Sequence, residues 1–341
     1  MDNDLRLGTR GSPLALWQAE TVASAIARAS RRRCRLVVIR TSGDRLQSAP
    51  LSDVGGKRLF VKEIEDALLQ GAVDLAVHSS KDLPAELPAG LDLAGVLPRE
   101  DPRDAVVLPA SQVPRTGNIS SVVQLKLALG DTPTLGTGSV RRSTQLTPLI
   151  PGARFTPIRG NLDTRLRKLD EGHHDGLVLA VAGLRRLGFA MRVSYALPVE
   201  QCVPAPGQGI VAIETRADDE ATRSAVEAIS DRAAMAALAA ERALVAALGG
   251  GCRLPVGALA VPVDDDELHM RAVVVALDGT RSVRAEARGT HLDLAGLGRR
   301  VADELLRQGA AAILAEAERA LTPERPTGEG TAGPGASDPD A

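Results

Sequence analysis

Arginine side chains follow most of the predicted strands of this chain, in the loops that lead from a strand into the next helix. In open α/β sheets, ligands collect at the carboxyl ends of strands, where such loops meet helix N-termini. A guanidinium binds a carboxylate through two parallel hydrogen bonds, and a helix N-terminus adds backbone N–H donors. Any one of these arginines could equally be a solvated surface residue, but together they indicate a ligand with several carboxylates. The set comprises Arg10, Arg141, Arg142, Arg159, Arg165, Arg185 and Arg186.

Two further residues have side chains that can take part in a reaction. Asp82 stands next to Lys81 after a predicted strand, where it is either a turn residue or a functional carboxylate. In an arginine-rich cleft, a carboxylate would stabilise a cationic intermediate or move protons. Cys252 follows three glycines, which predict a flexible loop that presents its thiol, although a small buried hydrophobe is the usual role of cysteine. Cys34 is a weaker candidate because it precedes a predicted buried strand.

The sequence lacks the motifs of several other classes. It has no His-Glu-x-x-His and no Cys-x-x-Cys, and His173-His174 lacks metal-ligand spacing, so no metal site is expected. The segment at 136–139 is not a Walker loop, because no Lys-Ser/Thr follows, and it lacks the third glycine of a dinucleotide fingerprint. A net charge of -2 and 1% aromatic residues argue against nucleic acid, which favours basic surfaces and exposed rings.

Alternating strand and helix signals predict parallel βαβ units whose sheets are covered on both faces. The expected strands are 5–7, 36–39, 74–78, 105–108, 134–135, 154–158 and 177–181. The expected helices are 12–29, 61–69, a short one at 122–129, one from 140 onwards and one at 162–169. The connection at 110–131 is otherwise expected to be loop, because it has no periodicity.

The pattern changes after Gly209. An alanine-rich helix at 232–248, a hairpin of 268–277 with 282–288 and one final helix at 292–321 predict a separate α+β domain. The segment 322–341 is rich in Pro, Gly, Ser and acidic residues, which is typical of a disordered tail.

Length and composition set the remaining expectations. A chain of 341 residues, with 44% hydrophobic and 25% charged residues, predicts a globular protein of two or three domains. The N-terminus has no basic region followed by an apolar one, and no apolar run approaches the ~20 residues of a membrane span. Three widely spaced cysteines fit a reducing cytoplasm. A monomer with neither membrane nor nucleic-acid partners is expected, since no exposed apolar stripe is evident.

Several distinctive segments occur in a fixed order from residue 5 to about 320. They include AVHSSKDLP at 76–84, GTGSVRR at 136–142 and PAPGQG at 204–209. The others are 8–19, 54–63, 99–104, 159–161, 164–166, 179–184 and 250–252. In this order they resemble the porphobilinogen deaminase (hydroxymethylbilane synthase) family, and they are too long and specific to match by chance.

The resemblance implies an α/β fold with two domains like type II periplasmic binding proteins, an active site between them and a smaller α+β C-terminal domain. The first domain would comprise 1–98 and 204–226 and carry the catalytic aspartate. The second, at 99–203, would carry the arginine-rich carboxylate site. The third, at 227–321, would carry the cysteine to which the cofactor is attached.

The resemblance also implies a transferase reaction of tetrapyrrole (haem) biosynthesis. Cys252 would hold a dipyrromethane cofactor, onto which four porphobilinogen molecules are condensed before hydrolysis releases hydroxymethylbilane. Asp82 would stabilise the cation left when porphobilinogen loses ammonia. The residues that would hold the acid groups of the cofactor are Lys81, Thr137, Ser139, Arg141, Arg142, Arg159 and Arg165. Those that would line the pocket of the incoming substrate are Arg10, Ser12, Gln18, Phe60 and Arg186.

Each pyrrole ring carries an acetate and a propionate, so a growing polypyrrole explains many arginines in a protein of slightly negative charge. Two positions depart from the family pattern: Ser42 stands where Arg is common, and Gly138 where Ser is frequent. A non-catalytic anion-binding protein with the same two-domain clamp is the main alternative, but it would lack the Cys252 loop and the third domain. A degenerate relative that binds the substrate without turnover stays open.

Overall fold

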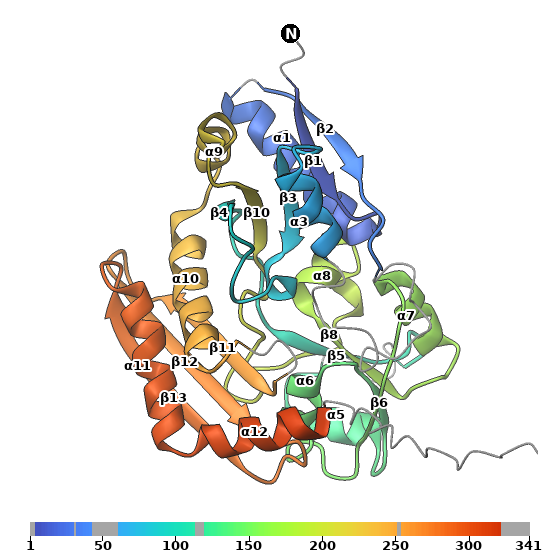
Figure 1. Ribbon diagram of the computed structural model, residues 1–341. Coiled ribbons are helices and arrows are strands. Elements are labelled where there is room, and N and C mark those ends of the chain that lie inside the picture. Colours follow the sequence, from blue (N-terminus) through green and yellow to red (C-terminus); the bar gives the residue numbers. More distant parts are fainter. Residues whose placement is uncertain (1–3, 31, 43–60, 113–118, 251–253, 322–341) are drawn as a thin grey trace, which may run out of the picture.

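The computed structural model describes residues 4–30, 32–42, 61–112, 119–250 and 254–321 (Figure 1). Two predicted site residues, Phe60 and Cys252, lie outside the described residues, and so does the predicted tail at 322–341.

The first sheet has five strands in the order β2-β1-β3-β10-β4. Their bounds are β1 Leu5–Thr9, β2 Cys34–Val38, β3 Leu75–Ser79, β4 Leu91–Val96 and β10 Val211–Arg216. The helices of this domain are α1 Pro13–Ser30, α3 Lys62–Leu69 and α9 Glu220–Glu227. Apolar side chains of α1, such as Val22 and Ile26, pack on Leu7 and Leu75 of the sheet.

The sheet differs from the sequence-based expectation in two respects. Strands β1, β2 and β3 are parallel as predicted, but β10 runs antiparallel to both β3 and β4, so the sheet is mixed. Neither β4 nor β10 was predicted. Strand β2 was expected to be buried, but it forms an edge of the sheet, where Val38 is 53% exposed.

The second sheet repeats this arrangement in the order β7-β6-β8-β5-β9. Its strands are β5 Asp104–Val107, β6 Thr134–Gly136, β7 Arg154–Thr156, β8 Gly176–Ala180 and β9 Tyr195–Ala196. Its helices are α5 Val122–Leu129, α6 Val140–Leu146, α7 Leu162–Asp170, α8 Val181–Arg186 and the 3-10 helix η3 Ala190–Arg192. Here β6, β7 and β8 are parallel and β5 is antiparallel to its neighbours, as β10 is in the first sheet.

The chain therefore crosses twice between two halves of the same topology. It leaves the first sheet after β4 to begin β5, and it returns after β9 to form β10 (Figure 1). Two similar α/β domains joined by two crossovers are the arrangement expected of a binding-protein-like pair, and this prediction is confirmed. The crossovers, at 97–103 and 197–210, pass between the two halves.

The third domain is a three-stranded antiparallel sheet covered by helices. Its strands are β11 Val256–Pro262, β12 Glu267–Val275 and β13 Ser282–Thr290, and its helices are α10 Arg232–Ala247, α11 Leu294–Arg307 and α12 Ala310–Leu321. The predicted hairpin is confirmed, but the single final helix is wrong. Gly309 adopts φ +98° between α11 and α12, a left-handed conformation that ends a helix.

A buried glutamate ties this third domain to both crossovers. Glu241 of α10 is fully buried and accepts hydrogen bonds from Arg99 (2.6 Å), from the Gly207 backbone N–H (2.6 Å) and from the Ala260 N–H (2.8 Å). Arg99 belongs to the first crossover and Gly207 to the second. A buried carboxylate is tolerated because it has a cation and several N–H donors.

Candidate active site

The end of β3 leads directly into the 3-10 helix η2 Ser80–Asp82, which carries Lys81 and Asp82. The second crossover passes against this turn, because the Ser80 N–H donates to the Ile210 carbonyl at 3.0 Å. Gly207 adopts φ +72°, and a Cβ there would lie 2.5 Å from Ser80 Oγ and 3.2 Å from the Lys81 backbone nitrogen. Only glycine fits both the conformation and the close approach.

Lys81 lies among charges from both domains. The pKa of Lys81 is lowered to about 8, chiefly by burial and in addition by the positive charges of Arg142 and Arg141, while Asp82 and Asp104 act in the opposite direction. Arg142 belongs to α6 of the second domain. The structure therefore brings the predicted catalytic turn of the first domain next to the paired arginines of the second.

Arg165 of α7 approaches the same site. The pKa of Arg165 is lowered to about 10, chiefly by burial and in addition by the positive charges of Arg142 and Arg159, while Asp82 acts in the opposite direction. Its Nε donates to the Gly160 carbonyl at 2.7 Å, which holds the side chain against the 159–161 loop. The Arg159 guanidinium makes no hydrogen bond or ion pair with any residue that the structure describes.

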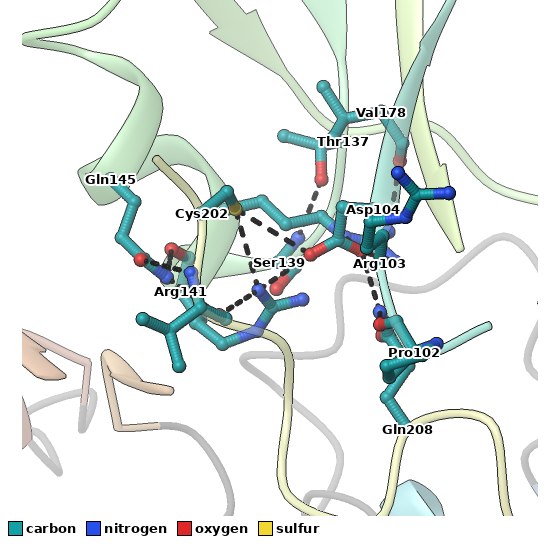
Figure 2. Close-up of polar contacts among 12 residues, drawn as sticks. Pro102, Arg103, Asp104, Thr137, Ser139, Arg141, Gln145, Val178, Cys202 and Gln208 are labelled. Carbon is teal, nitrogen blue, oxygen red and sulfur yellow. Dashed lines mark hydrogen bonds and ion pairs between the residues drawn. The ribbon is translucent and has the colours of Figure 1, made fainter. Parts of the chain in front are cut away.

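One carboxylate, Asp104, binds both Arg141 and Arg142; its contact with Arg141 is drawn in Figure 2. The Asp104 oxygens accept from Arg141 Nη1 at 2.7 Å and from Arg142 Nε at 2.9 Å. Burial alone would raise the pKa of Asp104, but the two guanidinium groups outweigh it and hold that pKa well below its usual range. Arg141 also donates to the Val203 carbonyl (2.8 Å) and Arg142 to the Val178 carbonyl (2.9 Å). Both arginines are thus buried, and both are bound to protein acceptors.

The same carboxylate reaches the second crossover. Gln208 Nε2 donates to Asp104 Oδ1 at 3.0 Å and to the Pro102 carbonyl at 2.6 Å (Figure 2). Cys202 Sγ lies 3.6 Å from Asp104 Oδ2, and burial raises the pKa of this thiol to about 12, so it is no nucleophile at neutral pH. Sequence reasoning gave Asp104 and Gln208 no role, although both lie in segments that carry the family resemblance.

The loop before α6 supplies the predicted hydroxyl groups. Thr137 is 6% exposed, and its Oγ1 accepts a hydrogen bond from the Ser139 N–H at 3.2 Å. Ser139 is the N-cap of α6 but makes no side-chain capping bond. A Cβ on Gly138 would meet no described atom within 4 Å, so the family's frequent serine would fit there.

Four of the five residues predicted for the incoming substrate are described. Arg10 lies directly after β1, and Ser12 Oγ caps α1 by accepting from the Ala15 N–H at 3.3 Å. Gln18 is 2% exposed and donates to Ser79 Oγ at 2.9 Å, so its amide is bound at the end of β3. Arg186, from the end of α8, donates to the Gly209 carbonyl at 2.6 Å.

Arg185 and Ser42 have other partners. Arg185, which was grouped with the strand-end arginines, pairs with Glu100 at 2.8 Å and Asp101 at 3.3 Å. Ser42, the departure from the family pattern, donates its backbone N–H to Glu63 Oε1 at 2.8 Å.

The donor set fits a ligand with several carboxylates. Lys81, Arg142 and Arg165 converge on a region in which Asp82 and Asp104 are the opposing charges, and burial disfavours the cationic forms of Lys81 and Arg165. Carboxylates of a bound group would stabilise these buried cations. Within the described residues, no group of three or more His, Cys, Asp or Glu could hold a metal ion. No described helix is both long enough and apolar enough to cross a membrane.

The fold and the site define an α/β protein of two binding-protein-like domains, with a cationic site at their junction and a third domain beside the crossovers. Comparison with known proteins agrees. The chain matches the family models "Porphobilinogen deaminase, dipyromethane cofactor binding domain" over residues 5–224 and "Porphobilinogen deaminase, C-terminal domain" over 235–307. The chain belongs to the porphobilinogen deaminase family.

Individual relatives extend this comparison. Porphobilinogen deaminases from two strains of Acidithiobacillus ferrooxidans are 44% identical over 321 residues, which is 94% of this chain and 100% of each relative. Among solved structures, the methionine binding protein MetQ is similar at 15% identity with a TM-score of 0.41, over 69% of this chain and 93% of that one. The fold assignment rests on the strand order of the two sheets rather than on this weak structural likeness.

Proposed function

We propose that this chain is a porphobilinogen deaminase. It condenses four porphobilinogen molecules, with loss of ammonia at each addition, onto a dipyrromethane cofactor attached to Cys252, and then releases hydroxymethylbilane by hydrolysis. The observation that supports this most directly is the position of Asp82. Its carboxylate comes from the first domain and lies in a cluster of cations that includes Arg165 of the second.

Each predicted site residue then has a physical role. Lys81, Thr137, Ser139, Arg141, Arg142, Arg159 and Arg165 hold the acid groups of the cofactor and the growing chain. The cofactor, when bound, supplies the pyrrole carbon to which the first substrate is joined. Asp82 stabilises the positive charge that develops on porphobilinogen as ammonia leaves, and it can hold the proton that carbon–carbon bond formation releases. Arg10, Ser12, Gln18, Phe60 and Arg186 meet the incoming substrate.

Arg141 and Gln18 have the least direct roles in this proposal. Both are buried and bound to protein groups, Arg141 to Asp104 and Gln18 to Ser79. We propose that these two side chains mainly hold the surrounding residues of the site in place. Any contact with a ligand would be made by the side-chain N–H groups that these hydrogen bonds do not use.

The domain division supports the same proposal. The first domain is 1–98 with 204–226, the second 99–203 and the third 227–321, because each of the three sheets falls within one of these divisions. We further propose that the protein is a monomer in the cytoplasm and that porphobilinogen is its small-molecule partner. Cys34 and Cys202 are free thiols, which fits a reducing compartment.

Intact mass measurement tests the proposed function. Purified wild-type protein should carry a covalent addition of two porphobilinogen units less their amines, and Cys252→Ser should carry none. Asp82→Asn should still load the cofactor while elongation nearly stops. An unmodified wild-type chain that turns nothing over would contradict the proposal, and a loaded chain without turnover would instead identify a substrate-binding relative.

A further inference from the structure

A tryptophan and an arginine meet where the first and second domains join. Arg186 Cζ lies 5.5 Å from the centroid of the Trp17 ring. A guanidinium within about 6 Å of an indole face is attracted by the negative charge of the ring face. Trp17 belongs to α1 of the first domain and Arg186 to α8 of the second, so this contact bridges the boundary.

Helices α1 and α8 also approach each other at a second point. A Cβ on Gly183 of α8 would meet only Leu14 Cδ2 of α1, at 3.9 Å. Leu14 precedes Trp17 by three positions, and Gly183 precedes Arg186 by three, so each pair lies on one face of its helix. The face of α1 that carries Trp17 therefore lies against the face of α8 that carries Arg186.

Arg186 is anchored on one side and open on the other. Its Nη2 donates to the Gly209 carbonyl of the second crossover, while Nε and Nη1 make no hydrogen bond with any residue in the described part of the chain. Burial lowers the pKa of Arg186 to about 10, and Glu100 is the carboxylate that opposes this. Glu100 itself pairs with the neighbouring Arg185 at 2.8 Å. Arg186 therefore has capacity for a further carboxylate.

We propose that Trp17 is a positioning residue for substrate capture: its indole face fixes the plane of the Arg186 guanidinium so that the open edge receives a carboxylate of incoming porphobilinogen. This inference rests on the proposed function, in which Arg186 meets the substrate. The next residue, Gln18, donates to Ser79 at the start of the Ser80–Asp82 turn. One turn of α1 thus contacts both Arg186, through Trp17, and the residue before the Ser80–Asp82 turn, through Gln18.

The inference predicts a change in substrate capture rather than in chemistry. A cation–π contact of this kind contributes about 1 kcal/mol, which is a factor of about 5. Trp17→Leu should raise the KM for porphobilinogen about fivefold to tenfold and leave kcat within about twofold. Trp17→Phe retains an aromatic face and should recover most of the KM. A fall in kcat at unchanged KM, or an equal loss in both variants, would overturn the proposal.

The fluorescence of Trp17 tests the contact without relying on turnover. Trp17 is the one tryptophan of the chain, so its emission reports on this position alone. Arg186→Ala should uncover the indole and raise its quenching constant with acrylamide about twofold. Arg185→Ala, which removes the neighbouring arginine that binds Glu100, should leave quenching unchanged. Equal quenching in the wild type and Arg186→Ala would show that the guanidinium does not cover the ring.

The two measurements separate failure of the inference from failure of the proposed function. If the wild type carries no cofactor and has no activity, the proposed function fails, and the inference fails with it even where quenching confirms the contact. If the wild type is loaded and active but Trp17→Leu has a wild-type KM, only the inference fails. A circular-dichroism melt of each variant checks that it is folded before the kinetic comparison.

Discussion

Lys81 shows how burial sets the chemistry of a single residue in this site. Its ammonium is taken out of water next to the positive charges of Arg142 and Arg141, while Asp82 and Asp104 favour its charged form. An amine with a pKa of about 8 is charged at neutral pH but loses that charge under mildly alkaline conditions. Carboxylates of a bound polypyrrole would raise this pKa again, so Lys81 and its ligand stabilise each other.

Loading of the cofactor should therefore fall as the pH rises through about 8, the pKa of Lys81 in the folded protein. The cofactor-free protein, made in cells that cannot synthesise porphobilinogen, is incubated with porphobilinogen from pH 7 to 9.5 and the loaded fraction is measured by mass. Lys81→Arg keeps its charge throughout this range and should show a flatter profile. The same decline in both proteins would remove Lys81 as its cause.

A rise in pH affects the stability of the cofactor-free fold in the opposite direction to cofactor loading. Because the folded pKa is about 8 and the unfolded pKa is near 10.5, the unfolded state binds more protons between these values. This group alone therefore makes the cofactor-free fold more stable as the pH rises across that interval.

At the scale of the elements, the site depends on how closely the second crossover passes the end of β3. Gly207 touches the Ser80–Asp82 turn without a side chain, and Gly209 accepts from Arg186 on its other side. The crossover thus contacts both the turn that carries Asp82 and the helix that carries Arg186. A displacement of the second crossover would therefore move both the Ser80–Asp82 turn and Arg186.

Gly207→Ala should disable the site by steric displacement. Its Cβ would approach Ser80 Oγ to 2.5 Å and so shift Lys81 and Asp82, and we expect kcat/KM to fall at least about 100-fold. Gly188→Ala is the matched control, because Gly188 has a similar φ of +77° but a Cβ there would meet no described atom within 4 Å. The control should lose only about 1 kcal/mol of stability in a urea titration and keep its activity. Near-normal kcat/KM in Gly207→Ala would show that the turn does not depend on this contact.

On the scale of the whole molecule, two buried carboxylates connect the domains. Glu241 ties the third domain to both crossovers through Arg99 and Gly207, and Asp104 ties α6 to the start of β5 and to Gln208. Each lies where chain segments that are far apart in sequence meet. Arg141 and Arg142 are therefore held by a carboxylate that also binds the second crossover.

Asp104→Asn should destabilise the protein by about 3–5 kcal/mol, because it leaves two buried guanidinium groups without their counter-charge. Urea unfolding at pH 7 measures the change. Glu316→Gln removes the partner of Arg281 in an exposed pair and should leave the midpoint within error. The folded pKa of Asp104 is depressed, so its contribution is present above the unfolded pKa of 3.8 and is lost as the pH falls through the folded value. Equal midpoints for both variants would contradict the role of Asp104.

The sequence by itself determined the local elements and the identity of the chemistry. The sequence predicted α1 and α10 closely, the start of α6 and a short helix near α5, because an amphipathic or capped helix is encoded within a few turns of chain. The ordered motifs predicted the family, and the strand-end arginines indicated a carboxylate-rich ligand before any contact was known. Position after a strand left Asp82 as either a turn residue or a functional carboxylate, and the family resemblance gave it its predicted role.

Only the tertiary structure decided which of these residues lie free and which are bound to protein groups. Strand β10 was missed because its partners β3 and β4 precede it by more than a hundred residues, so no local pattern specifies an antiparallel neighbour. For the same reason no local pattern indicates that Asp104 holds both Arg141 and Arg142, or that Trp17 covers Arg186. Such contacts arise where two crossovers bring separate domains together, and their energies depend on burial, which is a property of the folded chain.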